Sequence, residues 1–89
     1  MPSACPAIVL DSHDNVATAL APLAAGQVVA LEAATVTLAA DIPSGHKFAL
    51  RPIAEGEAVV KYGQPIGRAT AAIAPGQHVH THNVASQRA

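Results

Sequence analysis

The sequence is poor in aromatic residues and cysteine, which limits both its core and its chemistry. Phe48 and Tyr62 are the only large rings, tryptophan is absent, and the 89 residues contain one cysteine, Cys5. A single cysteine cannot form an internal disulfide, and no adjacent motif activates this one as a catalytic thiol. A chain of this length buries only about 60–65% of the surface that its unfolded form exposes. We therefore expect one thin-cored domain, residues 1–89, for which help from a partner is plausible.

Clusters of positive charge and long apolar runs are also missing. The net charge is −1 and no group of Lys and Arg stands together, so the positive patch that nucleic-acid binding needs is absent. The longest apolar stretch, residues 17–25, is interrupted by Thr18 and Pro22 and is far shorter than the ~20 residues that span a bilayer. No signal peptide is visible. We expect no nucleic-acid partner, no membrane contact and a cytoplasmic location.

One segment near the N-terminus has the pattern of a short helix. Asp14 or Asn15 could supply the N-cap, and Gly26 stands where a C′ glycine would end the helix. Three apolar residues share one helical face at i, i+4 and i+7: Val16, Leu20 and Leu23. The pattern predicts one helix, which Pro22 near its end would shorten.

The rest of the chain is divided by glycine and proline into short strands. Residues 7–10, 47–53 and 59–70 are strand-forming stretches, and Pro65 places an edge, a bend or a bulge in the last of them. Four turns share an apolar residue, a glycine three positions later and another apolar residue soon after; they span residues 23–29, 42–48, 53–59 and 73–79. The glycines are unevenly spaced, which is unlike a solenoid.

These elements predict a mainly β domain with one short helix near the N-terminus. Many short strands joined by Gly- and Pro-rich turns are typical of such small, irregular β domains. At the ends of the chain, residues 1–6 and 84–89 are expected to be flexible.

Three histidines alternate near the C-terminus, in the segment HVHTHN at residues 78–83. On a strand, His78, His80 and His82 would share one face. Two of them with a further ligand would make a transition-metal site, and the same imidazoles could transfer protons or bind a carboxylate. Asn83, which can donate and accept hydrogen bonds, adds to this set. The alternative is a polar, solvent-exposed face of an edge strand.

Two other polar groups could bind the same kind of ligand. His46 and Lys47 follow the turn glycine Gly45, where N–H groups, an imidazole and an ammonium together suit a carboxylate or an alkoxide. Lys61 and Tyr62 place an ammonium beside a phenol, which can both address an anion. In each case a plainer alternative stays open: His46 and Lys47 as solvated turn residues, and Tyr62 as a core ring.

Four segments carry a resemblance to a known family: DNVA at 14–17, IPSGHK at 42–47, VVKYGQPIGRAT at 59–70 and GQHVHTHN at 76–83. In this order they resemble the SAF-type N-terminal domain of the altronate and galactarate dehydratase family, over nearly the whole chain. The resemblance implies a β-clip fold and a much larger catalytic domain, either fused or on a separate chain. It also implies that this chain alone is inactive.

The family eliminates water, or sulfite in its sulfolactate branch, from 2-hydroxy acids, generally with a divalent metal such as iron. The resemblance thus implies a small accessory subunit that helps a large catalytic lyase subunit bind a 2-hydroxy sugar acid, with Fe²⁺ held mainly by that partner. A sulfolactate sulfo-lyase alpha subunit and a stand-alone binding module remain alternatives, and homo-oligomers stay open.

Carried onto this sequence, the resemblance and the residue chemistry give candidate roles. The candidate catalytic residues are His46, Lys47 and His80. The candidate substrate-binding residues are Lys61, Tyr62, His78 and Asn83. The candidate metal ligands are His80 and His82.

Overall fold

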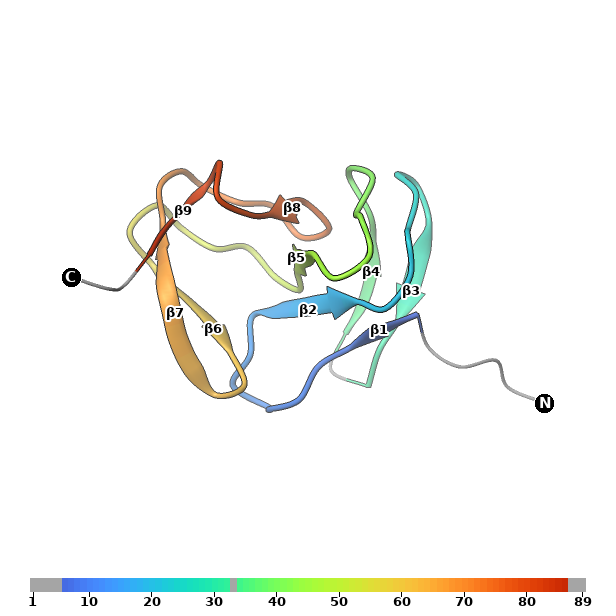
Figure 1. Cartoon of the computed structure of the whole chain (residues 1–89), viewed down its shortest axis with the longest axis horizontal. Helices are drawn as coiled ribbons and strands as arrows, with labels where there is room; N and C mark the ends of the chain where they lie inside the picture. The colour runs from blue at the N-terminus through green and yellow to red at the C-terminus, as the bar shows by residue number, and fades with distance from the viewer. Residues whose placement is uncertain (1–5, 33, 87–89) are drawn as a thin grey trace.

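The computed structural model describes residues 6–32 and 34–86, and every regular element in these residues is a β-strand (Figure 1). The strands are β1 (Ala7–Ile8), β2 (Val16–Ala19), β3 (Val28–Ala30), β4 (Thr35–Thr37), β5 (Lys47–Ala49), β6 (Ala58–Lys61), β7 (Gln64–Ala69), β8 (His78–Val79) and β9 (Val84–Ser86). The prediction of a mainly β domain is confirmed. This part of the chain contains no helix that is long and apolar enough to cross a membrane.

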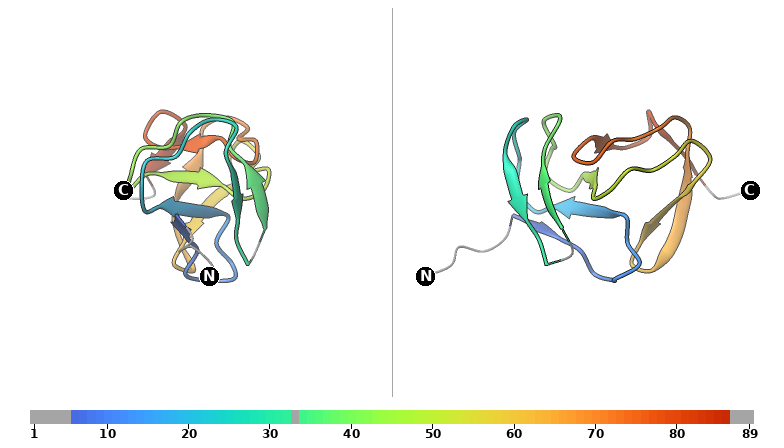
Figure 2. Two further views of the ribbon diagram at one scale, coloured as in Figure 1. Left: turned by 90° about the vertical axis from the view of Figure 1, so that its right-hand side faces the viewer. Right: turned by 180° about the vertical axis from the view of Figure 1, so that it is seen from behind.

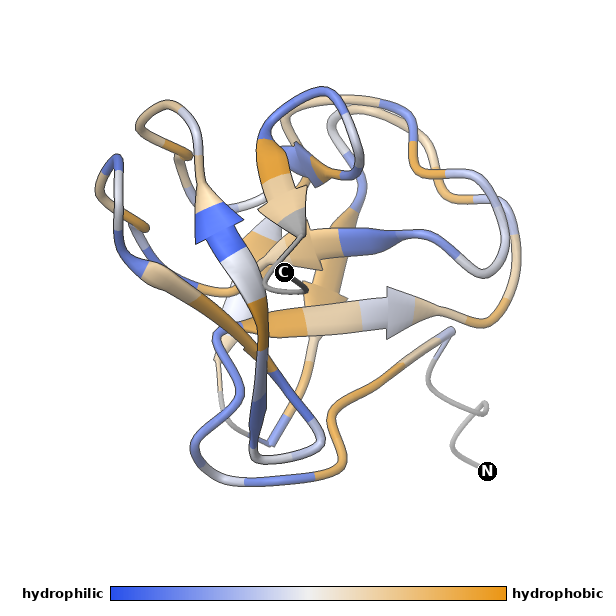
Figure 3. Cartoon of the chain, turned by 60° about the vertical axis from the view of Figure 1, so that its left-hand side comes forward, coloured by the Kyte–Doolittle hydropathy of each residue, from blue (hydrophilic) through white to orange (hydrophobic). Residues whose placement is uncertain are grey.

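The strands form three antiparallel sheets. The central sheet has the order β1-β2-β5-β8, and it lies between the β3–β4 hairpin on one side and the β6-β7-β9 sheet on the other (Figures 1 and 2). Figure 3 shows hydrophobic residues along β2 and its neighbours, and many hydrophilic residues in the connecting loops. The domain is therefore built outward from one shared sheet with a hairpin unit at each side.

The hydrophobic core is divided in the same way. One buried cluster packs beside the β3–β4 hairpin and contains Ala7, Ala17, Ala19, Leu23, Val29, Val36, Leu38, Ile42, Phe48 and Leu50. The other packs beside the β6–β7 hairpin and contains Val16, Ala49, Ile53, Val59, Ala69, Ile73 and Val79. The two large aromatic rings differ, since Phe48 is fully buried whereas Tyr62 is 52% exposed. Tyr62 is therefore not a core ring.

The four turns fall into two pairs, one in each half of the domain. An isolated bridge joins Leu23 to Ile42 at the base of the first hairpin, and another joins Ile53 to Ile73 at the base of the second. The turn glycines have φ angles of 87°, 84°, 85° and 81°, which suit the third position of a type II turn. Gly56 follows Gly26 by 30 residues and Gly76 follows Gly45 by 31. The uneven glycine spacing is thus that of a unit that occurs twice.

The two units meet where β5 pairs with β8. Lys47 and Phe48 of the first unit correspond to His78 and Val79 of the second, 31 residues later. In the antiparallel pair, Lys47 lies opposite Val79 and Phe48 lies opposite His78. This register is what a local twofold axis between β5 and β8 produces. The two strands therefore form the seam between the repeated units.

The predicted helix near the N-terminus is wrong, because its residues form β2 and the following turn. Val16 belongs to one core cluster and Ala17 and Ala19 to the other. Both faces of the strand are therefore buried, which removes the alternation that normally marks a strand in a sequence. The β-branched side chain of Val16 also favours a strand. Gly26 serves a tight turn rather than a helix C-terminus.

The two residues expected to cap that helix instead bind the β6–β7 hairpin. Asn15 Nδ2 donates to the Ala58 carbonyl at 2.9 Å, and Asn15 Oδ1 accepts the Val60 N–H at 2.8 Å. Asp14 Oδ1 accepts the Gly63 N–H at 2.8 Å. Asp14 and Asn15 are both buried. Their polar groups are satisfied by a distant segment, an outcome that local sequence cannot reveal.

Two smaller expectations have different outcomes. The predicted irregularity near Pro65 is confirmed, since the β6–β7 register shifts between Val59 and Val60, and β9 pairs only with residues 67–69 of β7. In the C-terminal segment that is expected to be flexible, residues 84–86 form β9. Residues 1–5 and 87–89, which include Cys5, lie outside the described residues.

Replacing Asn15 by alanine should destabilise the fold strongly. The change leaves a partly buried N–H and a partly buried C=O of β6 without their partners, at about 1–2 kcal/mol each, so we expect a loss of about 2–4 kcal/mol in unfolding free energy. Urea denaturation measures this loss. Ser12→Ala, in the exposed loop before β2, should change stability by less than about 0.5 kcal/mol. An equally small effect of Asn15→Ala would contradict this account of the hairpin contact.

Candidate functional site

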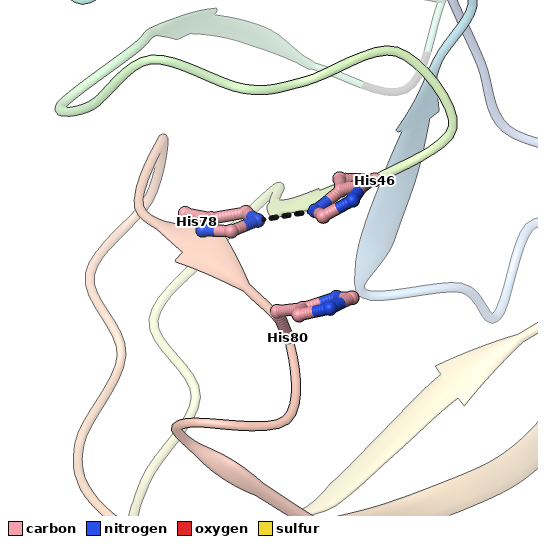
Figure 4. A group of neighbouring side chains, drawn as sticks. All are labelled: His46, His78 and His80. Atoms are coloured by element: carbon pink, nitrogen blue, oxygen red, sulfur yellow. Dashed lines mark hydrogen bonds between the residues drawn. The ribbon is translucent and has the colours of Figure 1, made fainter.

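Three histidines gather at the seam between the repeated units. His46 directly precedes β5, His78 begins β8, and His80 follows β8. The Nδ1 atom of His46 lies 2.9 Å from the Nε2 atom of His78, a hydrogen bond in which one of the two nitrogens carries the proton (Figure 4). The His80 ring stacks on His46 with the centroids 4.1 Å apart and the planes 16° from parallel. One ligand atom from each of the three rings lies within 4.8 Å of the others.

The chain turns sharply after β8, and Asn83 makes this turn. Its side chain is buried, with Oδ1 accepting the His80 N–H at 2.9 Å and Nδ2 donating to the His78 carbonyl at 2.8 Å. The strand that begins at His78 ends at Val79, because Asn83 closes the backbone into a turn, so His78, His80 and His82 do not share one strand face. The turn brings His80 onto His46. The exposed His82 ring lies 5.3 Å from that of His78, at a tilt.

The environment of His46 differs from that of the equivalent residue in the other three turns. In those turns the residue after the glycine uses its side-chain oxygen to accept a backbone N–H three positions earlier. The pairs are Gln27 with Ala24, Glu57 with Ala54 and Gln77 with Ala74, at 3.1, 2.8 and 2.9 Å. The remaining turn spans residues 42–48. There the residue that would donate the N–H is Pro43, which has none, and the residue that would accept it is His46. The imidazole is thereby released from the turn and bonds to His78.

This exception is visible in the sequence itself. Aligning the four turns places glutamine, glutamate or histidine directly after each glycine. Only the turn with His46 begins on a proline. The departure from the pattern therefore singles out His46 among the residues that follow a turn glycine.

Lys47, the first residue of β5, extends the site beyond the three histidines. Its half-buried side chain lines a cavity of about 190 Å³ together with Ile66, His80, Thr81 and Val84. None of these lining residues is acidic. Burial, and then the positive charge of Lys61, lower the pKa of the Lys47 ammonium. The cavity thus offers a partly desolvated cation with no carboxylate to neutralise it, a setting that favours an anionic ligand.

The same environment acts on two of the histidines. Burial lowers the pKa of His78, and nearby positive charge, first that of His46, lowers it further. Burial followed by the charges of His46 and Lys47 lowers the pKa of His80. Both rings are therefore held neutral near pH 7, where each can accept a proton or bind a metal through a ring nitrogen.

Lys61 and Tyr62 stand at the tip of the β6–β7 hairpin. Lys61 Nζ lies 4.7 Å from the centre of the Tyr62 ring. Tyr62 has a φ of 57°, a conformation that is uncommon for a residue other than glycine. The Gly63 N–H bonds to buried Asp14 and fixes this tip. Lys61 is close enough to Lys47 to lower its pKa.

The structure thus assembles part of the predicted set. His46, His78 and His80 lie together, and Lys47 shares the cavity with His80. The His82 ring lies beside that of His78, and Asn83 supports the loop through both ends of its amide. In the described part of the chain, Tyr62 has no hydrogen bond or ring contact with the histidines. The catalytic and binding roles of these residues remain predictions.

A larger hollow lies elsewhere and contains none of these residues. It is a groove of about 590 Å³ beside β1, lined by residues 7–12 and 30–32. Ile8 and Leu10 contribute exposed apolar surface there. Its size does not make it the chemical site, because it lacks the clustered imidazoles and the partly buried lysine.

Comparison with known proteins agrees with the motifs in the sequence. Residues 5–87 match the family model of the altronate/galactarate dehydratase SAF domain. The chain is 57% identical over 76 residues to altronate dehydratase of Escherichia coli (strain K12), and 40% identical over 76 residues to that of Bacillus subtilis (strain 168). Each match covers 85% of this chain and 15% of the relative. The chain therefore spans about 15% of the length of these relatives.

A second kind of relative is much shorter. The chain is 45% identical over 53 residues to (2R)-sulfolactate sulfo-lyase subunit alpha of Paracoccus pantotrophus. This match covers 60% of the chain and 79% of the relative. The chain thus matches a small portion of two long dehydratases and most of one short subunit.

Acidification should destabilise the domain through His78. Because its pKa in the fold is lowered, the unfolded chain binds more protons than the folded one once the pH falls below about 6.5, and stability then decreases. Urea unfolding at several values between about pH 7.5 and about pH 5 should show this decrease, and His78→Gln should flatten it. An unchanged pH dependence in His78→Gln would contradict the assignment. A histidine NMR titration gives the pKa directly.

Proposed function

The chain belongs to the altronate/galactarate dehydratase SAF domain family, and from this premise we propose that it is the accessory part of a lyase. In this proposal it helps bind a 2-hydroxy sugar acid from which a large catalytic subunit eliminates water. The chain spans about 15% of the altronate dehydratases that it matches. The remaining machinery lies in the part of the enzyme that corresponds to the rest of those relatives.

The observation that carries the proposal is the cavity lined by Lys47 and His80, which has no acidic residue in its lining. Lys47 can bind a carboxylate through a charge-assisted hydrogen bond, which is stronger when the pair is partly desolvated. The cavity volume of about 190 Å³ is below the ~300–1,000 Å³ of most small-molecule sites. It suits the carboxylate end of a substrate rather than a whole sugar acid. A second surface must then enclose the remainder, as a shared active site requires.

The imidazoles fit a role in proton transfer at that site. Elimination removes the proton α to the carboxylate and expels the β-hydroxyl, so a base and an acid are both needed. Neutral His80, beside Lys47 in the cavity, can accept a proton. The hydrogen-bonded pair of His46 and His78 can exchange one. A divalent metal such as Fe²⁺, held mainly by the partner, would assist departure of the hydroxyl.

Lys61, Tyr62 and Asn83 have supporting roles in this proposal. Lys61 and Tyr62 present an ammonium and a phenol at the hairpin tip, where they can reach substrate hydroxyls or the partner. Asn83 acts through the loop that it closes, because its amide is already occupied by the backbone of His78 and His80. Asn83 is thus better described as a positioning residue than as a substrate ligand.

A sulfolactate sulfo-lyase is the second candidate function. The observation in its favour is the short relative from Paracoccus pantotrophus, named as subunit alpha, of which the chain covers 79%. The same cationic cavity could hold the carboxylate of sulfolactate while sulfite leaves. The two functions use one site and differ in the leaving group, so the products distinguish them.

Reconstitution with a large catalytic subunit tests the proposal. Dehydration of altronate and galactarate, and release of sulfite from sulfolactate, are assayed with the large subunit alone and with both chains. We expect activity only with both. Lys47→Met should lower kcat/KM by about 10–100-fold, which corresponds to loss of one charge-assisted hydrogen bond. His13→Gln, in the exposed loop before β2, is the matched control and should keep full activity.

Two results would overturn the proposal. One is full activity of the large subunit alone, and the other is full activity with Lys47→Met. Calorimetry separates the stand-alone binding module, because tight binding of hexonates by the isolated chain favours the module. Binding that needs the large subunit favours the shared site.

A further inference from the structure

We propose that His46, His78 and His80 bind one divalent first-row transition-metal ion within this chain. This site differs from a metal held by a catalytic partner, and it does not depend on the proposed lyase function. Its ligands come from two places 32 residues apart in the sequence, joined by the β5–β8 seam. Two of the three lie outside the pair His80 and His82 that the sequence predicts.

The spacing of two ligand atoms already fits an ion. His46 Nδ1 and His78 Nε2 lie 2.9 Å apart. Two imidazole nitrogens bound about 2.1 Å from one ion lie about 3.0–3.4 Å apart at octahedral to tetrahedral angles. In the metal-free chain this pair shares one proton. On binding, that proton moves to the other nitrogen of the same ring, so that both atoms offer a lone pair to the ion.

His80 needs only a side-chain rotation to complete the set. Its ring stacks nearly parallel to that of His46 (Figure 4). The lone pair of the His80 ring nitrogen therefore does not point to the position between His46 Nδ1 and His78 Nε2. Within the described part of the chain, the ring nitrogens of His80 make no hydrogen bond that would fix the orientation of the ring. Its ligand nitrogen lies within 4.8 Å of the other two. A turn of the imidazole therefore brings the third nitrogen to the ion while Asn83 keeps the backbone fixed.

The donor set defines the class of ion. Three imidazoles without a carboxylate suit Zn²⁺, Co²⁺, Ni²⁺, Cu²⁺ or Fe²⁺, and not Mg²⁺ or Ca²⁺, which prefer oxygen ligands. Three protein ligands leave a coordination position open. His80, one of the three ligands, also lines the cavity that contains Lys47. Because Lys47 is cationic, an anion in the open position offsets the repulsion between the lysine and the ion.

Metal titration of the full chain tests the site without any assay of activity. The metal-free chain is titrated with Co²⁺ and with Zn²⁺, and binding is followed by calorimetry and by the visible absorption of Co²⁺. We expect one ion per chain, displacement of Co²⁺ by Zn²⁺, and no binding of Mg²⁺. His46→Gln, His78→Gln and His80→Gln should each weaken Zn²⁺ binding at least about tenfold, since each removes one of three ligands.

Matched controls separate this site from the terminal histidine pair. His82→Gln and His13→Gln should leave the affinity within about twofold of wild type. The proposal is overturned if the wild-type chain binds neither ion, if His46→Gln binds normally, or if His82→Gln costs as much as His46→Gln. A second measurement avoids folding defects in the variants: Zn²⁺ should shift the ring-nitrogen NMR signals of His46, His78 and His80 in wild-type protein. Shifts confined to His13 and His82 would refute the site.

Discussion

The antiparallel pairing of β5 with β8 is the contact on which the rest of the structure depends. It joins the two repeated units, each of which has its own hairpin and its own buried cluster. The contact is short, since β5 has three residues and β8 has two. It is secured by the burial of Phe48 and Val79, which lie in different clusters on adjacent strands. The same seam brings polar residues of the two units face to face.

The candidate site follows from this seam and from two departures from the repeated pattern. In the turn before β5, Pro43 removes the N–H that the equivalent residues donate, and His46 replaces the side chain that would accept it. After β8, Asn83 bends the chain so that His80 stacks on His46. Small changes to a structural repeat have thus produced an asymmetric cluster of imidazoles. All four turns nevertheless have a buried apolar anchor, which is Leu23, Ile42, Ile53 or Ile73.

The positive charge of Lys47 is not neutralised by any acidic residue that lines its cavity. Lys47 is partly buried and close enough to Lys61 for its pKa to fall, and the same surroundings lower the pKa values of His78 and His80. Concentrated positive charge of this kind costs stability in the isolated domain, and a bound anion relieves it. The electrostatics therefore favour an anionic ligand in this cavity, which the proposed function requires.

The strand content was predictable because glycine and proline mark turns by their own backbone preferences, whatever surrounds them. The four turns and the irregularity at Pro65 were found in this way. The β2 strand was missed because both of its faces are buried by segments distant in sequence. Asp14 and Asn15 look like helix caps until the β6–β7 hairpin supplies other partners for their side chains.

The sequence by itself determined which residues are candidates for the site. His46, Lys47, His78 and His80 stand out because imidazoles and an amine beside a turn glycine are uncommon in a chain so rich in Ala and Val. Only the tertiary structure decided which of them meet. Alternation along a strand groups His80 with His82, whereas the turn closed by Asn83 and the β5–β8 pairing group His80 with His46. The reason is that contacts across the seam depend on strand register, which no local pattern specifies.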